Sequence, residues 1–272
     1  MNLEAGLKRG DRLNAILELL AQSKQLEVED IVTRLHVSPA TARRDLDSLA
    51  AQRLLSRTRG GATIESGAYS LPLKQNRDLG ALRKRAIAYA ASALIPRGSV
   101  VGLCGGTTST ALAQVLSVRR DLMEPSNKPT LTVVTNAINI AAQLAVRPNI
   151  KIMVTGGIVN SRSSELVGPY TDAILQHVAL DFAFVGVNGL DPEFGPTVTD
   201  EGEAAVNAMV ARRAATAYIV ADSSKIGLRA FATMTGHAVS NLITDDGISE
   251  YQLAAFRERG TRVIVAPAVA ED

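Results

Sequence analysis

The residues of this chain that could bind or transform a ligand are concentrated in short loops that follow apolar segments. Gly105-Gly106-Thr107-Thr108-Ser109-Thr110 comes directly after the apolar stretch 99–104. Glycines let a ligand approach the backbone closely, and N–H groups at the start of a helix attract an anion. No lysine follows these glycines, so the segment is not a Walker loop. It predicts either a tight structural turn or a binding site for a phosphate group.

Other polar groups follow further apolar segments in the same way, and Glu203 lies near the start of an expected helix. These groups are Thr135-Asn136, Gly156-Gly157 and Asp222-Ser223-Ser224-Lys225. The ammonium group of Lys225 could meet the charge of a phosphate, although a single lysine is more often an ordinary surface residue. Several such loops together favour a small anionic ligand.

The elements that must position these loops alternate between two patterns. Apolar runs typical of buried strands cover residues 99–104, 131–135, 150–154, 182–187, 218–221, 241–244 and 262–265. Helices are expected over residues 82–95, 108–116, 137–146, 170–178, 201–214 and 251–259. Strands that are apolar throughout indicate a sheet covered on both faces, and the alternation predicts a Rossmann-like, mainly parallel α/β domain over 80–268. Ligands in such sheets bind beyond the carboxyl ends of the strands, where the polar loops lie.

The first part of the chain has a different character. Residues 34–60 contain six arginines and two aspartates. The spacing of leucine, isoleucine and valine predicts helices over 13–20 and 28–35. Ser38 is a good N-cap and Pro39 suits the first position of a third helix, which we expect to run to residue 50. Ala42, Leu46 and Leu49 should face inward, which leaves Ala40, Thr41, Arg43, Arg44 and Asp47 outside.

After the third helix, residues 54–64 predict a hairpin around Gly60-Gly61 that carries Arg57 and Arg59. A short capped helix with adjacent arginines suits the major groove of DNA, because arginine matches guanine edges and phosphates. The hairpin arginines could reach the adjoining backbone or the minor groove. The alternative is a solvated basic face on a small helical domain. The helices, turn, cap and hairpin together favour a winged helix-turn-helix domain over 8–64, joined by a linker over 65–79.

Two segments of this domain resemble the DeoR family of bacterial repressors. Val37-Ser38-Pro39-Ala40-Thr41-Ala42-Arg43-Arg44-Asp45-Leu46 is similar to the family's recognition segment, and Arg57-Thr58-Arg59-Gly60-Gly61-Ala62 to its wing. The resemblance continues to about residue 265 through Gly106-Thr107-Thr108, Val134-Thr135-Asn136, Gly156-Gly157, Glu203-Ala204, Asp222-Ser223-Ser224-Lys225 and Thr244-Asp245. The chain departs from the usual family residues at two positions: Ala42 replaces a usual isoleucine, and Cys104 replaces a common aspartate.

The resemblance implies a sensor domain similar to ribose-5-phosphate isomerase and glucosamine-6-phosphate deaminase. It implies a repressor of a sugar-catabolic operon whose effector is a phosphorylated sugar or sugar derivative. The residues expected to bind double-stranded operator DNA are Ser38, Ala40, Thr41, Arg43, Arg44, Arg57 and Arg59. The residues expected to bind the effector are Gly105, Gly106, Thr107, Thr108, Ser109, Asn136, Gly156, Gly157, Glu203, Asp222 and Lys225. Pseudopalindromic operators would require at least a dimer of this chain.

Composition narrows the remaining classes. The chain has 272 residues with a net charge of +2, one cysteine and three histidines without ligand spacing, so we expect no disulfide, metal site or cofactor. No signal peptide and no membrane-spanning run are recognisable, and we expect a cytoplasmic protein. Cys104 could be a small buried thiol or a redox sensor.

Two other functions are compatible with parts of the sequence: a sugar-phosphate isomerase or deaminase, and a protein that only bends DNA. A sugar-phosphate isomerase or deaminase needs a general base near the reacting carbons, and Glu203 could supply it. The related isomerases carry an acidic segment after their strand, whereas this chain has Gly186-Val187-Asn188-Gly189 there. Because that acidic segment is absent, we expect no enzymatic activity. The second rival is a protein that only bends DNA, and such a protein would not need so large an α/β part.

Overall fold

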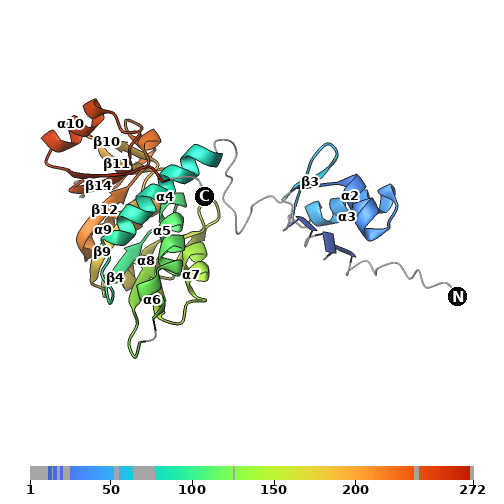
Figure 1. Cartoon of the computed structure of the whole chain (residues 1–272), viewed down its shortest axis with the longest axis horizontal. Coiled ribbons are helices and arrows are strands. Elements are labelled where there is room, and N and C mark those ends of the chain that lie inside the picture. Colours follow the sequence, from blue (N-terminus) through green and yellow to red (C-terminus); the bar gives the residue numbers. More distant parts are fainter. Residues whose placement is uncertain are drawn as a thin grey trace. The chain divides into compact units, whose positions relative to one another are not determined.

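The computed structural model describes residues 12–13, 15–16, 19–20, 25–51, 55–63, 77–124, 126–235 and 239–269. The chain divides into two compact units, Met1–Lys74 and Gln75–Asp272 (Figure 1). Most of the linker expected over 65–79 lies outside the described residues, and residues 77–79 already belong to the first helix of the second unit.

The first unit combines helices with a small antiparallel sheet. The described residues between 12 and 20 are helical, as predicted for the first helix. Then follow β1 (Gln25–Glu27), α2 (Val28–Leu35), α3 (Pro39–Ala51), β2 (Ser56–Arg57) and β3 (Gly61–Thr63). The strand order is β1-β3-β2, so the predicted hairpin is present and a third strand, which the sequence did not reveal, completes the sheet. The helices and the sheet enclose one apolar core, which includes Ile16, Leu26, Ile31 and Leu46.

The position of α3 is set by local chemistry. His36 has a left-handed backbone conformation with a φ of 52°, which ends α2. The Ser38 hydroxyl then accepts the N–H of Thr41 at 3.1 Å, so Ser38 is the N-cap that the sequence predicted. Pro39 occupies the first turn, where its missing N–H costs no hydrogen bond.

The second unit is built on a parallel sheet of seven strands. Its order is β15-β14-β12-β9-β4-β5-β6. The strands are β4 (Val100–Leu103), β5 (Leu131–Thr135), β6 (Ile150–Val154), β9 (Leu180–Gly186), β12 (Ala214–Val220), β14 (Asn241–Asp245) and β15 (Arg262–Ala266). Every neighbouring pair is parallel. The doubly wound α/β fold expected from the alternating pattern is confirmed.

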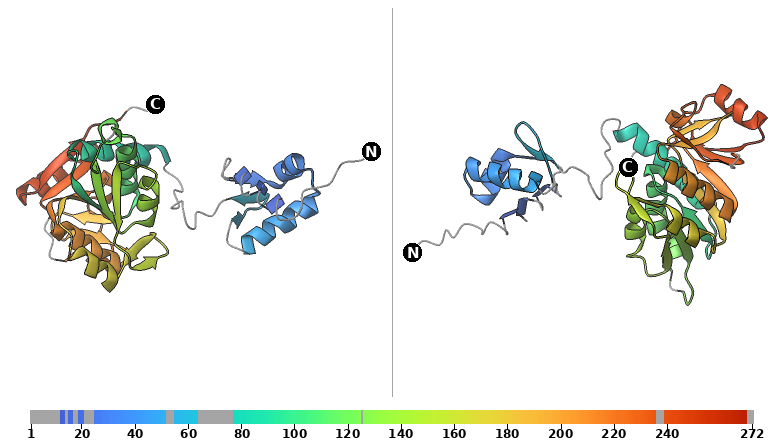
Figure 2. Two further views of the ribbon diagram at one scale, coloured as in Figure 1. Left: turned by 90° about the horizontal axis from the view of Figure 1, so that it is seen from below. Right: turned by 180° about the vertical axis from the view of Figure 1, so that it is seen from behind.

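Helices cover both faces of this sheet (Figures 1 and 2). One face carries α4 (Arg77–Ala93), α5 (Thr107–Val118) and α7 (Ile138–Leu144), with the short α6 (Arg120–Met123) against α5. The other face carries α8 (Pro169–Leu175), α9 (Glu201–Arg213) and α10 (Glu250–Glu258). Each layer encloses its own apolar core, which explains why the central strands are apolar on both sides.

Two small antiparallel sheets were missed by the sequence analysis. The hairpin of β7 (Ile158–Asn160) and β8 (Glu165–Val167) stands where a long loop was expected. A three-stranded sheet joins β10 (Gly189–Asp191), β11 (Gly195–Val198) and β13 (Ala232–Thr233). These strands have at most four residues each, too few to show the alternation by which a strand is recognised.

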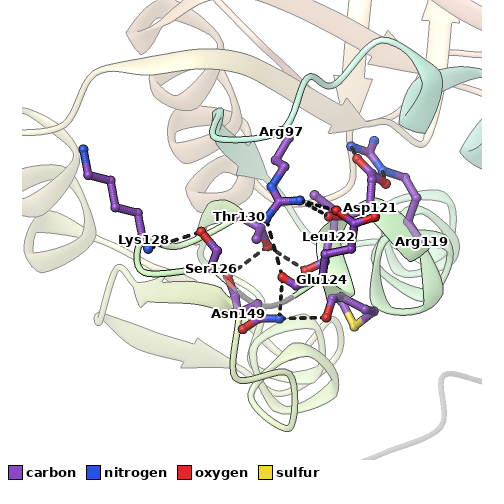
Figure 3. Close-up of polar contacts among 10 residues, drawn as sticks. Arg97, Arg119, Asp121, Leu122, Glu124, Ser126, Lys128, Thr130 and Asn149 are labelled. Atoms are coloured by element: carbon purple, nitrogen blue, oxygen red, sulfur yellow. Dashed lines mark hydrogen bonds and ion pairs between the residues drawn. The ribbon is translucent and has the colours of Figure 1, made fainter.

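A polar network joins the loops that precede β4, β5 and β6 (Figure 3). The Arg97 guanidinium donates to a Glu124 carboxylate oxygen at 2.8 Å, and the Asn149 amide donates to the Met123 carbonyl oxygen at 3.0 Å. The Thr130 hydroxyl donates to the Leu122 carbonyl oxygen at 2.7 Å. This is the amino edge of the sheet, away from the edge at which such folds bind ligands, so the network stabilises α6 and its neighbouring loops.

Among the described helices, none combines the length and the apolar character that a membrane-spanning segment requires.

Candidate functional site

The exposed face of α3 is the candidate DNA-reading surface. Ala42, Leu46 and Leu49 are buried, as the sequence predicted, while Ala40, Arg43 and Arg44 are exposed. Thr41 is half-buried, and its hydroxyl lies 2.9 Å from that of Ser38. The side chains expected to face outward therefore do so, with Thr41 and Ser38 partly occupied by the helix cap.

Both aspartates of α3 are neutralised by arginines from other segments. Asp45 is buried and forms an ion pair with Arg12, and this contact raises the pKa of the Arg12 guanidinium. Asp47 pairs with Arg57 at 2.9 Å. The face is left with the positive charges of Arg43 and Arg44, which have no partner among the described residues.

The hairpin arginines have different surroundings. The Arg57 guanidinium donates to the Gly61 carbonyl oxygen at 2.6 Å and reaches Asp47, so it fastens the hairpin to α3. Arg59 is exposed beside Gly60 at the turn of the hairpin. Of the two, Arg59 has the geometry of an available contact group.

The second unit contains a topological switch point between β4 and β9. The chain runs outward from β4 through β5 to β6 and then returns to the opposite side of β4 as β9. A Cβ atom on Gly186, the last residue of β9, would lie 3.2 Å from the Gly105 carbonyl oxygen and 3.6 Å from the Ser109 hydroxyl. The loop after β4 and the end of β9 therefore meet at the point where open α/β sheets bind their ligands.

Helix α5 begins at this switch point. Gly106 is its N-cap with a φ of +99°, and a Cβ atom there would meet nothing within 4 Å. The N–H groups of Thr107, Thr108 and Ser109 belong to the first turn, which has no intrahelical acceptors. The Ser109 hydroxyl is buried and has no hydrogen-bond partner within the described structure. This arrangement suits an anion such as a phosphate.

An acidic cluster lies beside the same loop. The carboxylate of Glu165 in β8 accepts the Asn136 amide at 3.0 Å and the backbone N–H of Gly105. Glu203 in α9 accepts the Asn160 amide at 2.9 Å. Burial, followed by the nearby charge of Glu203, raises the pKa of Glu165 to about 7, and burial also raises the pKa of Glu203. Gly105, Asn136 and Glu203 thus gather around a residue that the sequence analysis did not select.

Cys104 lies against this cluster but is not reactive. Its side chain has no exposed surface, and burial together with the charge of Glu165 raises its pKa well above the ordinary value. A thiol that stays protonated is a poor nucleophile and oxidises slowly. Of the two interpretations of Cys104, the small buried thiol is the one that the structure supports.

Asp222 and Lys225 belong to a separate group after β12. Asp222 is buried, accepts the Ser224 N–H at 3.1 Å and lies 3.9 Å from the Lys84 ammonium. The neighbouring Asp245 accepts the Ser223 N–H at 2.6 Å and pairs with Arg83 at 3.4 Å. Lys225 is half-buried and has no ion pair within the described residues. Lys225 follows β12 and Gly105 follows β4. Because these strands are parallel, both residues lie at the same edge of the sheet, with β9 between the two strands.

Gly156 and Gly157 form the turn between β6 and β7. Their φ angles are +68° and +128°, which favour glycine, and the Thr171 hydroxyl donates to the Gly156 carbonyl oxygen at 2.7 Å. A Cβ atom on Gly157 would overlap that hydroxyl. The turn therefore requires glycine at both positions.

Comparison with known proteins assigns both units. Residues 12–67 match the model of a DeoR-like helix-turn-helix domain, and residues 81–246 match that of the DeoR C-terminal sensor domain. The chain belongs to the DeoR family. This DeoR-family protein is 30% identical over 240 residues to the glycerol-3-phosphate regulon repressor of Escherichia coli (strain K12), covering 88% of this chain and 92% of that one.

A second relative and one solved structure complete the comparison. The HTH-type transcriptional regulator GlpR of Haloferax volcanii is 33% identical over 238 residues, covering 87% of this chain and 89% of that one. A D-ribose-5-phosphate isomerase in complex with phospho-erythronic acid aligns at 20% identity with a TM-score of 0.39, over 53% of this chain and 52% of that one. The family confirms the resemblance on which the sequence analysis relied.

The family assignment also decides between a regulator and an enzyme. The DeoR-family chain is a transcriptional regulator with an N-terminal helix-turn-helix and a C-terminal sensor. After β9, the Asn188 side chain accepts the Thr199 N–H at 3.1 Å, so this segment closes the open end of the β10–β11 hairpin. Among the described residues, no group of histidine, cysteine or acidic side chains is arranged to hold a metal ion.

Glu165 is the residue that sequence reasoning missed. It is a single acid inside an expected loop, outside every motif that carried the family resemblance. Its only sequence signal is an acid that directly precedes a leucine and a valine, which is weak. The hairpin that carries it back to Gly105 is a tertiary feature.

Proposed function

We propose that this protein is a cytoplasmic repressor of a sugar-catabolic operon and that a phosphorylated sugar or sugar derivative controls it. The proposal rests on the family assignment and on the relatives of the chain, which include a glycerol-3-phosphate regulon repressor. One observation carries it furthest. The start of α5 lies at the switch point of the sensor sheet and is open at Gly106. The other unit of the same chain has a helix, α3, with a basic face.

The effector is proposed to bind with its phosphate on the α5 N-terminus. The contact groups there are Gly106, Thr107, Thr108 and Ser109; Gly105, which the sequence also predicted at this site, already donates its N–H to Glu165 and would only border the phosphate. Lys225 adds a positive charge from the loop after β12, beside Asp222. Asn136, Gly156, Gly157 and Glu203 are proposed at the sugar end. A charged donor and backbone N–H groups together recognise phosphate well.

The operator is proposed to receive α3 in its major groove. Arg43 and Arg44 would contact base edges or phosphates, and Ser38, Ala40 and Thr41 would approach at the start of the helix. Arg57 and Arg59 would lie near the adjoining backbone. Two copies of the chain would present two such helices to paired half-sites, so the active form would be a dimer or a higher oligomer.

Control requires that the effector prefer one arrangement of the sensor. A ligand that bound both arrangements equally would shift nothing, however tightly it bound. We propose that the effector favours the arrangement that fits the operator poorly, which releases the DNA.

Two measurements test this function. Phosphorylated sugars are first screened by the thermal unfolding of the full chain, because a ligand that binds the folded state raises the midpoint. Each ligand found is then titrated into a complex of the protein with the DNA upstream of its own gene, at fixed salt. We expect a stabilising sugar phosphate to release the DNA. Specific DNA binding that no stabilising ligand changes would refute the effector control, and absence of specific DNA binding would refute the repressor itself.

A further inference from the structure

The hairpin β7–β8 brings a carboxylate to the place where β4 lacks one. Cys104, which stands where the family commonly has aspartate, directly precedes Gly105. The side chain of Glu165 fills the space beside Gly105, so that a Cβ atom there would overlap its carboxylate. Glu165 is only 4% exposed. An acid from β8 therefore lies beside the loop that follows β4.

The charge around this carboxylate is not balanced. Glu203, which is 6% exposed, and Asp200 at the start of α9 both raise the pKa of Glu165. Within the described part of the chain, no lysine, arginine or histidine forms an ion pair with Glu165 or Glu203. A buried carboxylate normally has a cation beside it, because its desolvation is otherwise costly.

The cluster also contains buried acceptors without donors. Asn136 has no exposed surface, and its amide nitrogen donates to Glu165 at 3.0 Å and to the Leu166 carbonyl oxygen at 3.3 Å. Those two bonds fix the orientation of the amide, and its Oδ1 has no partner. Asn207 lies one turn beyond Glu203 on α9, is also buried, and its Oδ1 has no partner either. Buried polar atoms without partners are uncommon, and these two acceptors are free to receive a donor from a bound ligand.

We propose that this acceptor cluster of Glu165, Glu203 and Asn136 recognises a positively charged amino group, so that the effector is a phosphorylated amino sugar. This inference rests on the effector site proposed above and specifies its ligand class. An ammonium group donates three hydrogen bonds and offsets the negative charge, whereas a hydroxyl group donates one and leaves the charge unbalanced. The phosphate takes the free N–H groups of Thr107, Thr108 and Ser109, because the N–H of Gly105 is already donated to Glu165.

The test compares ligands that differ in one group. Isothermal titration of the full chain at pH 7 uses glucosamine 6-phosphate against glucose 6-phosphate, and galactosamine 6-phosphate against galactose 6-phosphate. We expect at least one amino compound to bind about tenfold or more tightly than its hydroxyl partner. Glu165→Gln keeps the shape of the side chain and should reduce that preference to about threefold or less. Glu193→Gln, in the exposed turn after β10, is the matched control and should keep the full preference.

Proton release gives a second measurement on the unmodified protein. Binding of an ammonium group should lower the pKa of Glu165, so protons should be released at pH 7 in proportion to the fraction of protonated Glu165. The number is read from titrations in two buffers of different ionisation enthalpy. Release with the amino compound but not with its hydroxyl partner is expected. This readout decides the question even if Glu165→Gln does not fold.

The outcomes separate this inference from the proposed function. If both members of each pair bind equally and release the DNA equally, the amino group is not recognised and only this inference fails. A preference that survives Glu165→Gln also overturns it. If none of the four compounds binds while the protein still binds its DNA, this inference fails, whereas the proposed sugar-phosphate control is decided by the wider thermal screen.

Discussion

Glu165 should make the stability of the sensor unit depend on pH in the direction opposite to most acids. Its pKa rises from an ordinary value of 4.5 to about 7 in the folded protein. Below about pH 4.5 the carboxyl is protonated in both states and contributes nothing to the difference. Above pH 7 it is ionised in both, and the folded state then carries the cost of a buried charge. Stability is therefore lost as the pH rises from about 5 to about 8.

The size of this loss follows from the two pKa values. Each tenfold change in proton affinity corresponds to about 1.4 kcal/mol, so the difference amounts to about 3 kcal/mol. For a unit of this size, 1 kcal/mol shifts the melting midpoint by about 2–4 °C. About 2.5 kcal/mol of this difference falls between pH 5 and pH 8, so the midpoint of the sensor unit should fall by roughly 5–10 °C over that range. Asp121 and Asp191 have lowered pKa values and titrate below this window, so they do not mask the effect.

The measurement is thermal unfolding of wild type and Glu165→Gln across this pH range. The variant cannot ionise at this position, so it should lose most of the pH dependence and melt above wild type at pH 8. A smaller dependence should remain, because the pKa of Glu203 is raised as well. Glu193→Gln, at an exposed position, should follow wild type. Equal pH dependence in wild type and Glu165→Gln would refute the argument that Glu165 is a buried, uncompensated acid.

Three further predictions concern DNA, effector and turnover. Arg43→Ala and Arg44→Ala should each weaken operator binding by about 1–3 kcal/mol in a titration at fixed salt while leaving the melting midpoint unchanged, and unaltered affinity in both would exclude α3 as the reading helix. Lys225→Ala should bind operator normally but need more sugar phosphate for release; a wild-type response would remove Lys225 from the site. NMR of sugar phosphates incubated with the protein should show no isomerisation or deamination, and product in excess of protein that disappears in Glu203→Ala would reveal an enzyme.

Much of the fold could be read from the sequence because the signals were local. The central strands are buried on both faces, so each appears as a continuous apolar run that needs no knowledge of its neighbours. The start of α3 was equally accessible, since Ser38 and Pro39 act on the residues that follow them. The boundaries differ by a few residues, as with α4, which starts at Arg77 rather than at residue 82.

Only part of the candidate site could be predicted from the sequence, because only part of it is defined by local signals. The loop from Gly105 to Ser109 follows a recognisable strand, and its location at the sheet edge follows from parallel pairing. The contact of that loop with Glu165 could not be predicted, because the strands of the hairpin β7–β8 are too short to show a periodic pattern. The roles of Asp222 and Arg57 depend on Lys84 and Asp47, which reach them from other elements.

The sequence by itself determined the family, the α/β alternation, the outward face of α3 and the edge of the sheet at which a ligand should bind. Each of these depends on residue types within one segment or on motifs in a fixed order. Only the tertiary structure decided that Glu165 stands beside Gly105, that Cys104 is an inert buried thiol and that Asn136 has an unmet acceptor. The physical reason is that burial and charge depend on which distant segments meet. Asn136 and Glu165 are 29 positions apart in the sequence, and the segment between them gives no local sign that the two side chains meet.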